Sequence, residues 1–246
     1  MATVICPYVF PEEVVPLKNA FWNLDCIFEQ DTAKIGSDMM YQKLWKQTDD
    51  DIVIIHSDMQ PKEDDLDNQW YEDLMNYAKK YPEAGMLGCK LLYPARNEAG
   101  QFLIQHAGGR IDEEGSADHF GSGFRMEDKK FWKPPEVDEG QYDKVREVAW
   151  YTFGGIYIRR EVLDQVGNFD PRYKWSYNRD VDYSLEVRKA GWKIYQIPIP
   201  MYHFQSKDVK RIRTQEIVDE EAYNLKILKD KWKNSNLYKT LDKEVK

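Results

Sequence analysis

The sequence predicts an α/β protein with a central, mostly parallel sheet flanked by helices. Over residues 1–94, short β-branched runs alternate with segments whose apolar residues recur at helical spacing, which is typical of this class. The clearest strand is Asp51–Asp58, in which consecutive β-branched residues indicate burial on both faces. A chain of 246 residues without internal repeat or low-complexity linker is expected to form one domain over residues 1–246.

Each element of residues 1–94 is predicted from a local pattern. β-branched or apolar runs bounded by Pro or acidic residues predict strands, and apolar stripes such as Trp70, Leu74 and Tyr77 predict helices. The expected elements are a strand over Thr3–Cys6 ended by Pro7, a helix over 11–22, a strand over Leu24–Phe28, a helix over 36–47 that starts at Ser37 and Asp38, the Asp51–Asp58 strand, a helix over 66–80 and a strand over Gly85–Leu92.

The second part of the chain has a different composition. Residues 95–145 are rich in glycine, charge and aromatic rings, and we expect loops with short strands there. Further on, the expected elements are a strand-like segment over Glu147–Arg159, helices over Glu161–Val166 and Asp180–Ala190, a strand over Trp192–Ile197 and an amphipathic helix over Glu216–Trp232.

Composition argues against several function classes. The formal net charge of -8 argues against broad binding to nucleic acid. The 3 cysteines, Cys6, Cys26 and Cys89, form no CxxC pair, which favours a reducing compartment over a disulfide framework or a zinc site. The first residues do not have the pattern of a signal peptide, and no segment approaches the length of a membrane span. We therefore expect a cytoplasmic protein, or one held peripherally at a membrane surface.

Asp58 is the first candidate site residue, because it stands at the end of the buried strand. In open α/β sheets, ligands bind at the carboxyl ends of the strands. A carboxylate there is a suitable ligand for a Mg²⁺ or Mn²⁺ ion that bridges a diphosphate. The alternative role is a turn cap, which is common for Asp after a strand.

Polar residues late in the chain provide further candidates. Asp180 and Asp182 open an expected helix, where a carboxylate either caps the helix or acts as a general base. His203 follows the last expected strand, and its imidazole is either structural or completes a metal site. The basic residues beyond it form either a solvated face or a clamp for a diphosphate: Lys207, Lys210, Arg211 and Arg213.

Glycine pairs and aromatic rings are weaker signals. Gly108-Gly109 and Gly154-Gly155 let the backbone approach a ligand closely. Neither pair fits the dinucleotide fingerprint or the P-loop, which argues against dehydrogenases and kinases. Three aromatic residues near the candidate site either stack on an acceptor sugar or pack in the core: Trp150, Trp175 and Tyr177.

Six short segments are informative because of their order and spacing along the chain. They are DIVIIHSDMQP (51–61), PEAGMLGCKLLYP (82–94), IQHAGG (104–109), WYTFGGIYIRR (150–160), VGNFDPRY (166–173) and RDVDYSLEVRKAGW (179–192). Together with the last strand and His203, they resemble the inverting glycosyltransferases of family 2, particularly the rhamnosyltransferase-like branch. The resemblance implies a GT-A-type nucleotide-binding fold, shortened at the N-terminus. It also implies a nucleotide- and metal-binding half (1–94), an acceptor and catalytic half (95–206), and a basic loop with a C-terminal helix (207–246).

The resemblance implies roles for individual residues. Asp180 is the implied catalytic base, and Asp58 and His203 are the implied ligands of Mn²⁺ or Mg²⁺. The implied donor-binding residues are Pro7, Tyr8, Asp31, Ser57, Asp58, Gly154, Gly155, Lys207 and Arg211. The expected acceptor-binding residues are Trp150, Trp175, Tyr177 and Asp182.

Two positions depart from the family pattern. The metal motif is His56-Ser57-Asp58, so its first acidic residue is absent. Arg179 stands where the family has a Glu before the catalytic Asp. We expect this positive charge either to make the base more acidic or to alter the site.

Three functions remain open on this basis. The first is metal-dependent, inverting transfer of a sugar from a UDP-, GDP- or dTDP-sugar donor to a hydroxyl of a glycan or glycoconjugate. The alternative, favoured by the two departures and by the shortened N-terminus, is a catalytically degenerate domain that binds a carbohydrate or a partner. A sugar-phosphate nucleotidyltransferase ranks last, because it needs a loop rich in glycine and basic residues after the first strand, and Thr3–Pro11 contains neither glycine nor lysine.

Overall fold

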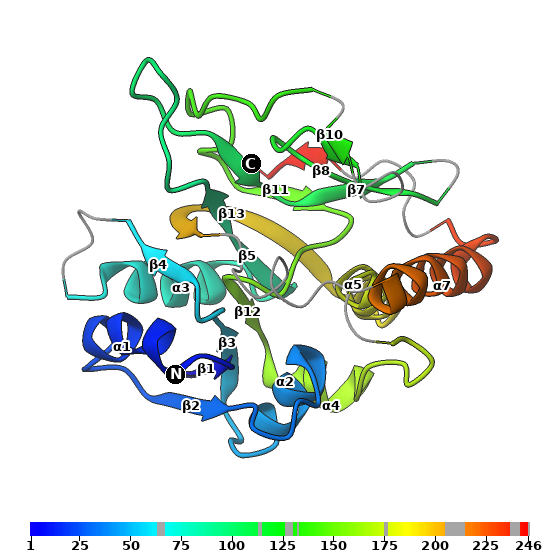
Figure 1. The fold of residues 1–246 in the computed structure, drawn as a ribbon, viewed down its shortest axis with the longest axis horizontal. Helices are drawn as coiled ribbons and strands as arrows, with labels where there is room; N and C mark the ends of the chain where they lie inside the picture. Colours follow the sequence, from blue (N-terminus) through cyan, green and yellow to red (C-terminus); the bar gives the residue numbers. More distant parts are fainter. Residues whose placement is uncertain are drawn as a thin grey trace.

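Residues 1–94 alternate between strands and helices, as the sequence predicts (Figure 1). The computed structural model describes residues 1–62, 67–112, 115–125, 130–131, 133–174, 177–204, 215–236 and 242–245. The elements of this first part are β1 (Ala2–Tyr8), α1 (Pro11–Ala20), β2 (Cys26–Gln30), α2 (Ser37–Trp45), β3 (Asp51–Ile54), β4 (Met59–Pro61), α3 (Gln69–Lys80) and β5 (Ala84–Leu92).

The second part contains the expected short strands and two longer helices. Its elements are β6 (Ile104–His106), β7 (Gly109–Ile111), β8 (Ala117–His119), β9 (Phe124–Arg125), β10 (Lys130–Phe131), β11 (Arg146–Val148), β12 (Ile156–Ile158), α4 (Arg160–Val166), α5 (Arg179–Lys189), β13 (Lys193–His203), α7 (Gln215–Trp232) and β14 (Asp242–Glu244). Among the residues described, no helix is both long and apolar enough to cross a bilayer.

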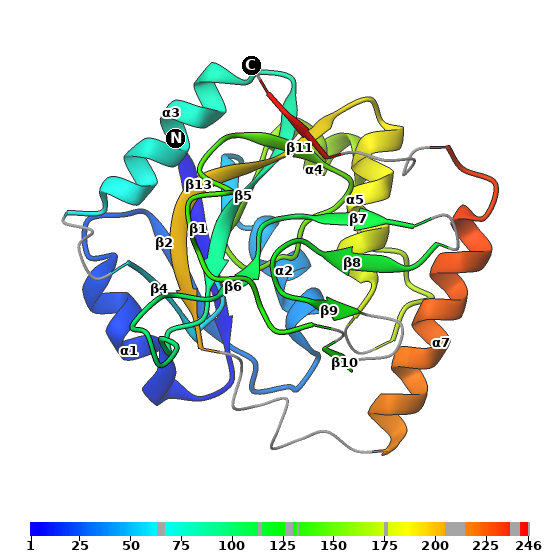
Figure 2. The same cartoon turned by 90° about the horizontal axis from the view of Figure 1, so that it is seen from above.

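One central sheet takes strands from both parts of the chain, and a smaller sheet lies beside it (Figure 2). The central order is β14-β11-β13-β5-β12-β3-β1-β2, with β4 paired to β13 and β6 paired to β5. The smaller sheet has the order β10-β9-β8-β7. The predicted α/β class with a mostly parallel core is therefore confirmed.

Strand direction decides where a ligand can bind. β1, β2 and β3 are parallel, and β12 runs antiparallel between β3 and β5. β5 and its parallel partner β13 therefore run in the same direction as β3. The carboxyl ends of these strands lie at one edge of the sheet, which we call the carboxyl-end edge: Tyr8, Gln30, Ile54, Leu92 and His203.

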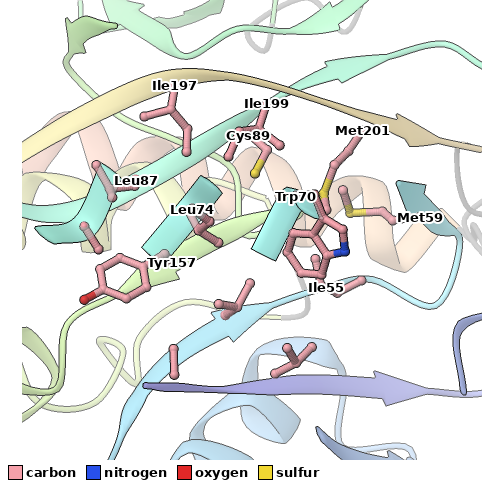
Figure 3. Close-up of a cluster of buried hydrophobic side chains, with 14 of the residues drawn as sticks. Ile55, Met59, Trp70, Leu74, Leu87, Cys89, Tyr157, Ile197, Ile199 and Met201 are labelled. Atoms are coloured by element: carbon pink, nitrogen blue, oxygen red, sulfur yellow. The ribbon is translucent and has the colours of Figure 1, made fainter. Parts of the chain in front are cut away.

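Helices pack against both faces of the sheet. Because neighbouring side chains of a strand point to opposite faces, they enter different clusters. Ile5 packs with residues of α2, α4 and α5, whereas Val4 packs with residues of α1 and α3. Figure 3 shows the second of these clusters, with Trp70 of α3 close to Met59. Ile55 and Met59 are both fully buried in this cluster. Residues 56–58, which lie between Ile55 and Met59, are therefore fixed in place at both ends.

Three expected boundaries are wrong, each for a local reason. β1 continues through Pro7, which pairs with β2 at Glu29. The segment over Glu147–Arg159 is two strands, because β11 pairs with β13 while β12 lies between β3 and β5. β13 does not stop before Pro198, because the register shifts between Ile197 and Pro200, and a bulge of this kind accommodates proline.

Candidate active site

The chain segment after β3 and the end of β13 meet at the carboxyl-end edge. β4 pairs antiparallel with β13, which sets His203 opposite Met59. The backbone N–H of Phe204 also donates to the carbonyl of Asp58 at 2.8 Å. As a result, Nε2 of His203 lies 3.3 Å from Oδ1 of Asp58. The structure thus brings together the two residues for which the sequence predicts a metal site.

His56, which the sequence does not predict as a site residue, joins this pair. The ligand atoms of His56, Asp58 and His203 all lie within 4.8 Å of one another, and we call these residues the histidine–aspartate cluster. The ring of Tyr41 stacks on His56 with centroids 6.1 Å apart. The sequence carried a signal, since His56 occupies the first position of the metal motif. From the sequence alone, that position indicates only that the family's first acid is absent.

The electrostatics of the cluster suit a cation. Burial lowers the pKa of His56 to about 4, so this imidazole is neutral at pH 7 and offers a lone pair. Burial opposes ionisation of Asp58, but its hydrogen bond to His203 and the two nearby imidazoles hold its pKa below the ordinary value. Oδ2 of Asp58 is buried and has no hydrogen-bond partner. A carboxylate with two imidazoles is a common ligand set for divalent metal ions.

The glycine pair lies directly against the cluster. A Cβ atom on Gly154 would come within 3.1 Å of the imidazole of His56 and of the sulfur of Met59. Gly155 has a φ of +68°, which disfavours other residues. Gly154 and Gly155 precede β12, whose amino end lies at the carboxyl-end edge. The backbone there passes close to the cluster without covering it with a side chain.

Asp180 opens α5, and its environment differs from the expected one. Burial, with the nearby charge of Asp38, raises the pKa of Asp180 to about 7. The guanidinium of Arg179 is turned toward α2, where it donates to Asp38 at 3.0 Å, and it also donates to the carbonyl of Tyr173 at 2.5 Å. The expectation of a more acidic base is therefore wrong, because the positive charge of Arg179 is engaged by Asp38.

Helix α2 connects this region to the histidine–aspartate cluster. Asp38 and Tyr41 lie three residues apart, on one face of the helix. Asp38 pairs with Arg179 of α5, and Tyr41 stacks on His56. Because Tyr41 is also within electrostatic reach of Asp58, α2 contacts both sets of charged residues.

We expect Asp38→Ala to lower the free energy of unfolding by about 3–5 kcal/mol, because it leaves the guanidinium of Arg179 buried and unpaired. Urea unfolding at pH 7 measures this loss. Lys144→Ala is the control, because it removes an exposed ion pair with Glu244 and should cost about 1 kcal/mol or less. Equal effects of the two substitutions would contradict the proposed importance of the buried pair.

The predicted donor residues near the N-terminus lie at the same edge. Tyr8 and Gln30 are register partners at the ends of β1 and β2. The carboxylate of Asp31 accepts the N–H groups of Ile35 and Gly36 at 2.9 and 2.8 Å, so it also shapes the loop before α2. Pro7 is half-buried beside Tyr8.

Ser57 lies inside the metal motif itself. Its hydroxyl donates to Glu13 of α1 at 3.2 Å. This contact ties the motif to the helix that follows β1. The donor-binding role of Ser57 stays a prediction.

The predicted acceptor residues that the structure describes make structural contacts. Trp150 and Tyr177 pack in one hydrophobic cluster, which also contains Trp232. Trp150 has no exposed surface, and its Nε1 donates to the carbonyl of Arg110 at 3.1 Å, so in this structure it offers no platform to a sugar. Asp182 binds Lys231 at 2.9 Å and Nε1 of Trp232 at 2.7 Å, and thereby attaches α7 to α5. Tyr177 is half-buried just before α5. Trp175, Lys207 and Arg211 lie outside the described residues.

A second pair of histidines lies near the glycine pair, with His106 buried and His119 half-buried. The backbone N–H of Thr152 donates to Nε2 of His106 at 3.4 Å, so the proton of this neutral imidazole is on Nδ1. Nδ1 of His106 in turn lies 2.8 Å from Nδ1 of His119, which accepts it. Burial lowers the pKa of His119 to about 4, and burial beside His119 holds the pKa of His106 well below its ordinary value.

This histidine pair predicts a loss of stability in acid. A buried neutral histidine stabilises the fold fully above its unfolded pKa of about 6.5, and the contribution is lost as the pH falls toward the folded value. His119, with a folded pKa of about 4, should cost up to roughly 3 kcal/mol by pH 4. We expect His119→Gln to reduce the difference in unfolding free energy between pH 7 and pH 4.5, measured with urea. An unchanged difference would contradict this account.

Known proteins match this fold and these motifs. No protein-family model matches the chain. The solved structure of GalNAc-T7 with UDP, GalNAc and Mn²⁺ is similar to it, with a TM-score of 0.53 and 12% identity, over 82% of this chain and 43% of that one. The fold is therefore of the GT-A glycosyltransferase type.

Sequence relatives specify the branch. The O-antigen biosynthesis protein RfbC of Myxococcus xanthus is 28% identical over 147 residues, which are 58% of this chain and 10% of that protein. The N-acetylglucosaminyl-diphospho-decaprenol L-rhamnosyltransferase of Mycobacterium tuberculosis is 26% identical over 156 residues, which are 61% of this chain and 45% of that protein. The chain thus spans less than half the length of either relative. These matches confirm the resemblance to the rhamnosyltransferase-like branch of family 2, and the predicted enzyme class, glycosyltransferase, agrees with the name of the second relative.

Proposed function

We propose that the chain transfers a sugar, with inversion, from a nucleoside-diphosphate sugar to a hydroxyl of a glycan or glycoconjugate. The observation that carries this proposal is the histidine–aspartate cluster, whose ligand atoms lie within 4.8 Å of one another at the carboxyl-end edge. Open α/β sheets bind their ligands at this edge. The name of one relative, N-acetylglucosaminyl-diphospho-decaprenol L-rhamnosyltransferase, describes sugar transfer and supports the proposal.

The cluster fits a divalent metal ion. His56, Asp58 and His203 would hold it, and the buried Oδ2 of Asp58, which has no hydrogen-bond partner, fits a cation. Because two of the three ligands are nitrogen atoms, we expect Mn²⁺ to bind better than Mg²⁺, which prefers oxygen. When bound, the ion would neutralise the charge of the departing diphosphate.

Asp180 is the proposed general base. Its pKa of about 7 lets it accept a proton near neutral pH while it remains largely ionised above pH 7. The proton of the acceptor hydroxyl passes to the carboxylate of Asp180, and the acceptor oxygen forms a bond to the anomeric carbon. The bond from that carbon to the diphosphate oxygen breaks on the opposite face. One displacement of this kind inverts the configuration.

The remaining donor contacts are proposed from position. Pro7, Tyr8 and Asp31 would line the nucleoside at the ends of β1 and β2. Gly154 and Gly155 would lie beneath the donor sugar, where the absence of side chains leaves room. Lys207 and Arg211, outside the described residues, remain candidates for contacts to the diphosphate.

A thermal-shift panel of UDP-, GDP- and dTDP-sugars, each with and without Mn²⁺, tests this function. A ligand at a hundred times its dissociation constant adds about 2.7 kcal/mol to the unfolding free energy. We expect one nucleotide class to raise the melting temperature in a Mn²⁺-dependent manner, and release of its nucleoside diphosphate in the presence of acceptor. Binding without any release supports the degenerate domain instead, and no stabilisation by any donor contradicts the proposed transfer.

A further inference from the structure

Gln105, on β6, contacts the metal-site histidine from outside the cluster. Its side chain is 8% exposed. Oε1 lies 2.6 Å from Nδ1 of His203, and Nε2 donates to the main-chain carbonyl of the same residue at 3.3 Å. β6 and β13 both pair with the end of β5, at Leu92, which brings Gln105 beside His203. The proposed reaction gives Gln105 no contact with the donor or the acceptor, so its two hydrogen bonds to His203 need a separate explanation.

The main-chain carbonyl fixes which way the amide of Gln105 points. A carbonyl oxygen only accepts hydrogen bonds, so the NH₂ group of Gln105 faces it. Oε1 must then face Nδ1 of His203, and because Oε1 also only accepts, Nδ1 carries a proton. In a neutral imidazole the other nitrogen, Nε2, then holds the lone pair.

Nε2 faces the proposed metal position. It lies 3.3 Å from Oδ1 of Asp58, so the two atoms share a proton in the metal-free protein and could hold a cation in its place. Metal-binding histidines usually donate their second N–H to a carbonyl or carboxylate, which orients the ring and fixes the tautomer.

We infer that Gln105 is a positioning residue, which holds the proton of His203 on Nδ1 and so directs Nε2 to a divalent metal ion shared with Asp58. This inference rests on the metal-binding part of the proposed function. Gln105 touches neither donor nor acceptor in this role, because it acts through the orientation and tautomer of His203.

Two substitutions separate this role from simple packing. Gln105→Leu has a similar size but no acceptor for the Nδ1 proton, whereas Gln105→Glu retains an acceptor. We expect the dissociation constant for Mn²⁺, measured by calorimetry, to rise about 10–100-fold in Gln105→Leu and to stay within a few-fold of wild type in Gln105→Glu. Gln101→Leu, an exposed glutamine four residues earlier, is the matched control and should change nothing.

Nitrogen NMR of the metal-free protein reads the tautomer directly. We expect Nδ1 of His203 to be protonated in the wild type and in Gln105→Glu, and unprotonated in Gln105→Leu. Equal Mn²⁺ affinity and a protonated Nδ1 in Gln105→Leu would overturn the inference. If the wild type binds no Mn²⁺, the metal-binding part of the proposed function fails as well. The NMR result then reports separately whether Gln105 sets the proton position.

Discussion

Asp180→Asn is expected to lower kcat by about 10²–10⁴-fold, the range typical of a positioned general base. The amide is almost the same size as the carboxylate but cannot accept the proton of the acceptor hydroxyl. Because the histidine–aspartate cluster is unchanged, the dissociation constant of the donor should remain close to that of wild type. Steady-state transfer assays measure kcat, and calorimetry measures donor binding.

The pH dependence offers a second readout for Asp180. Its pKa of about 7 implies that kcat/KM falls as the pH drops through 7, because the protonated acid is no longer a base. This acidic limb should disappear from the residual activity of Asp180→Asn. The control is Asp230→Asn, which makes the same change at an exposed position of α7. Full activity in Asp180→Asn would remove Asp180 from the mechanism.

Much of the fold could be predicted because its strands are locally distinct. The buried run Ile52–Ile55 identified β3, and the stripe containing Trp70 and Leu74 identified α3. β14 could not be predicted, because Asp242–Glu244 is a short charged segment whose strand geometry depends on pairing with β11. The continuation of β13 beyond Ile197 depends likewise on a bulge against β5, which is a tertiary feature.

The site could be predicted only in part, for a similar reason. Asp58 and His203 were found because a polar residue at the end of an expected strand is visible in the sequence. The pairing of Arg179 with Asp38 joins residues far apart in sequence, so it could not be anticipated. The same is true of Gln105, whose contact with His203 arises from two strands that meet at β5. Burial of Trp150 was also hidden, since an aromatic ring suits a core and a sugar platform equally.

Asp58→Asn is expected to remove the stabilisation of the protein by Mn²⁺. At a hundred times its dissociation constant, the ion should add about 2.7 kcal/mol to the wild type. For a chain of this length this corresponds to a rise of about 5–10 °C in the melting temperature. The variant should show almost no rise, because it lacks the single carboxylate of the histidine–aspartate cluster. Differential scanning calorimetry at several Mn²⁺ concentrations measures the effect.

Metal-free stability distinguishes loss of a ligand from loss of the fold. Asp58→Asn also removes the charge that pairs with His203, so we expect the metal-free melting temperature to fall while the variant still folds, and the rise on adding Mn²⁺ is measured from that lower value. Asp49→Asn makes the same change just before the amino end of β3, far along the strand from the cluster, and should retain the full Mn²⁺ response. A normal Mn²⁺ response in Asp58→Asn would mean that the ion binds elsewhere. In that case the carboxyl-end edge would have to hold the diphosphate with basic side chains alone.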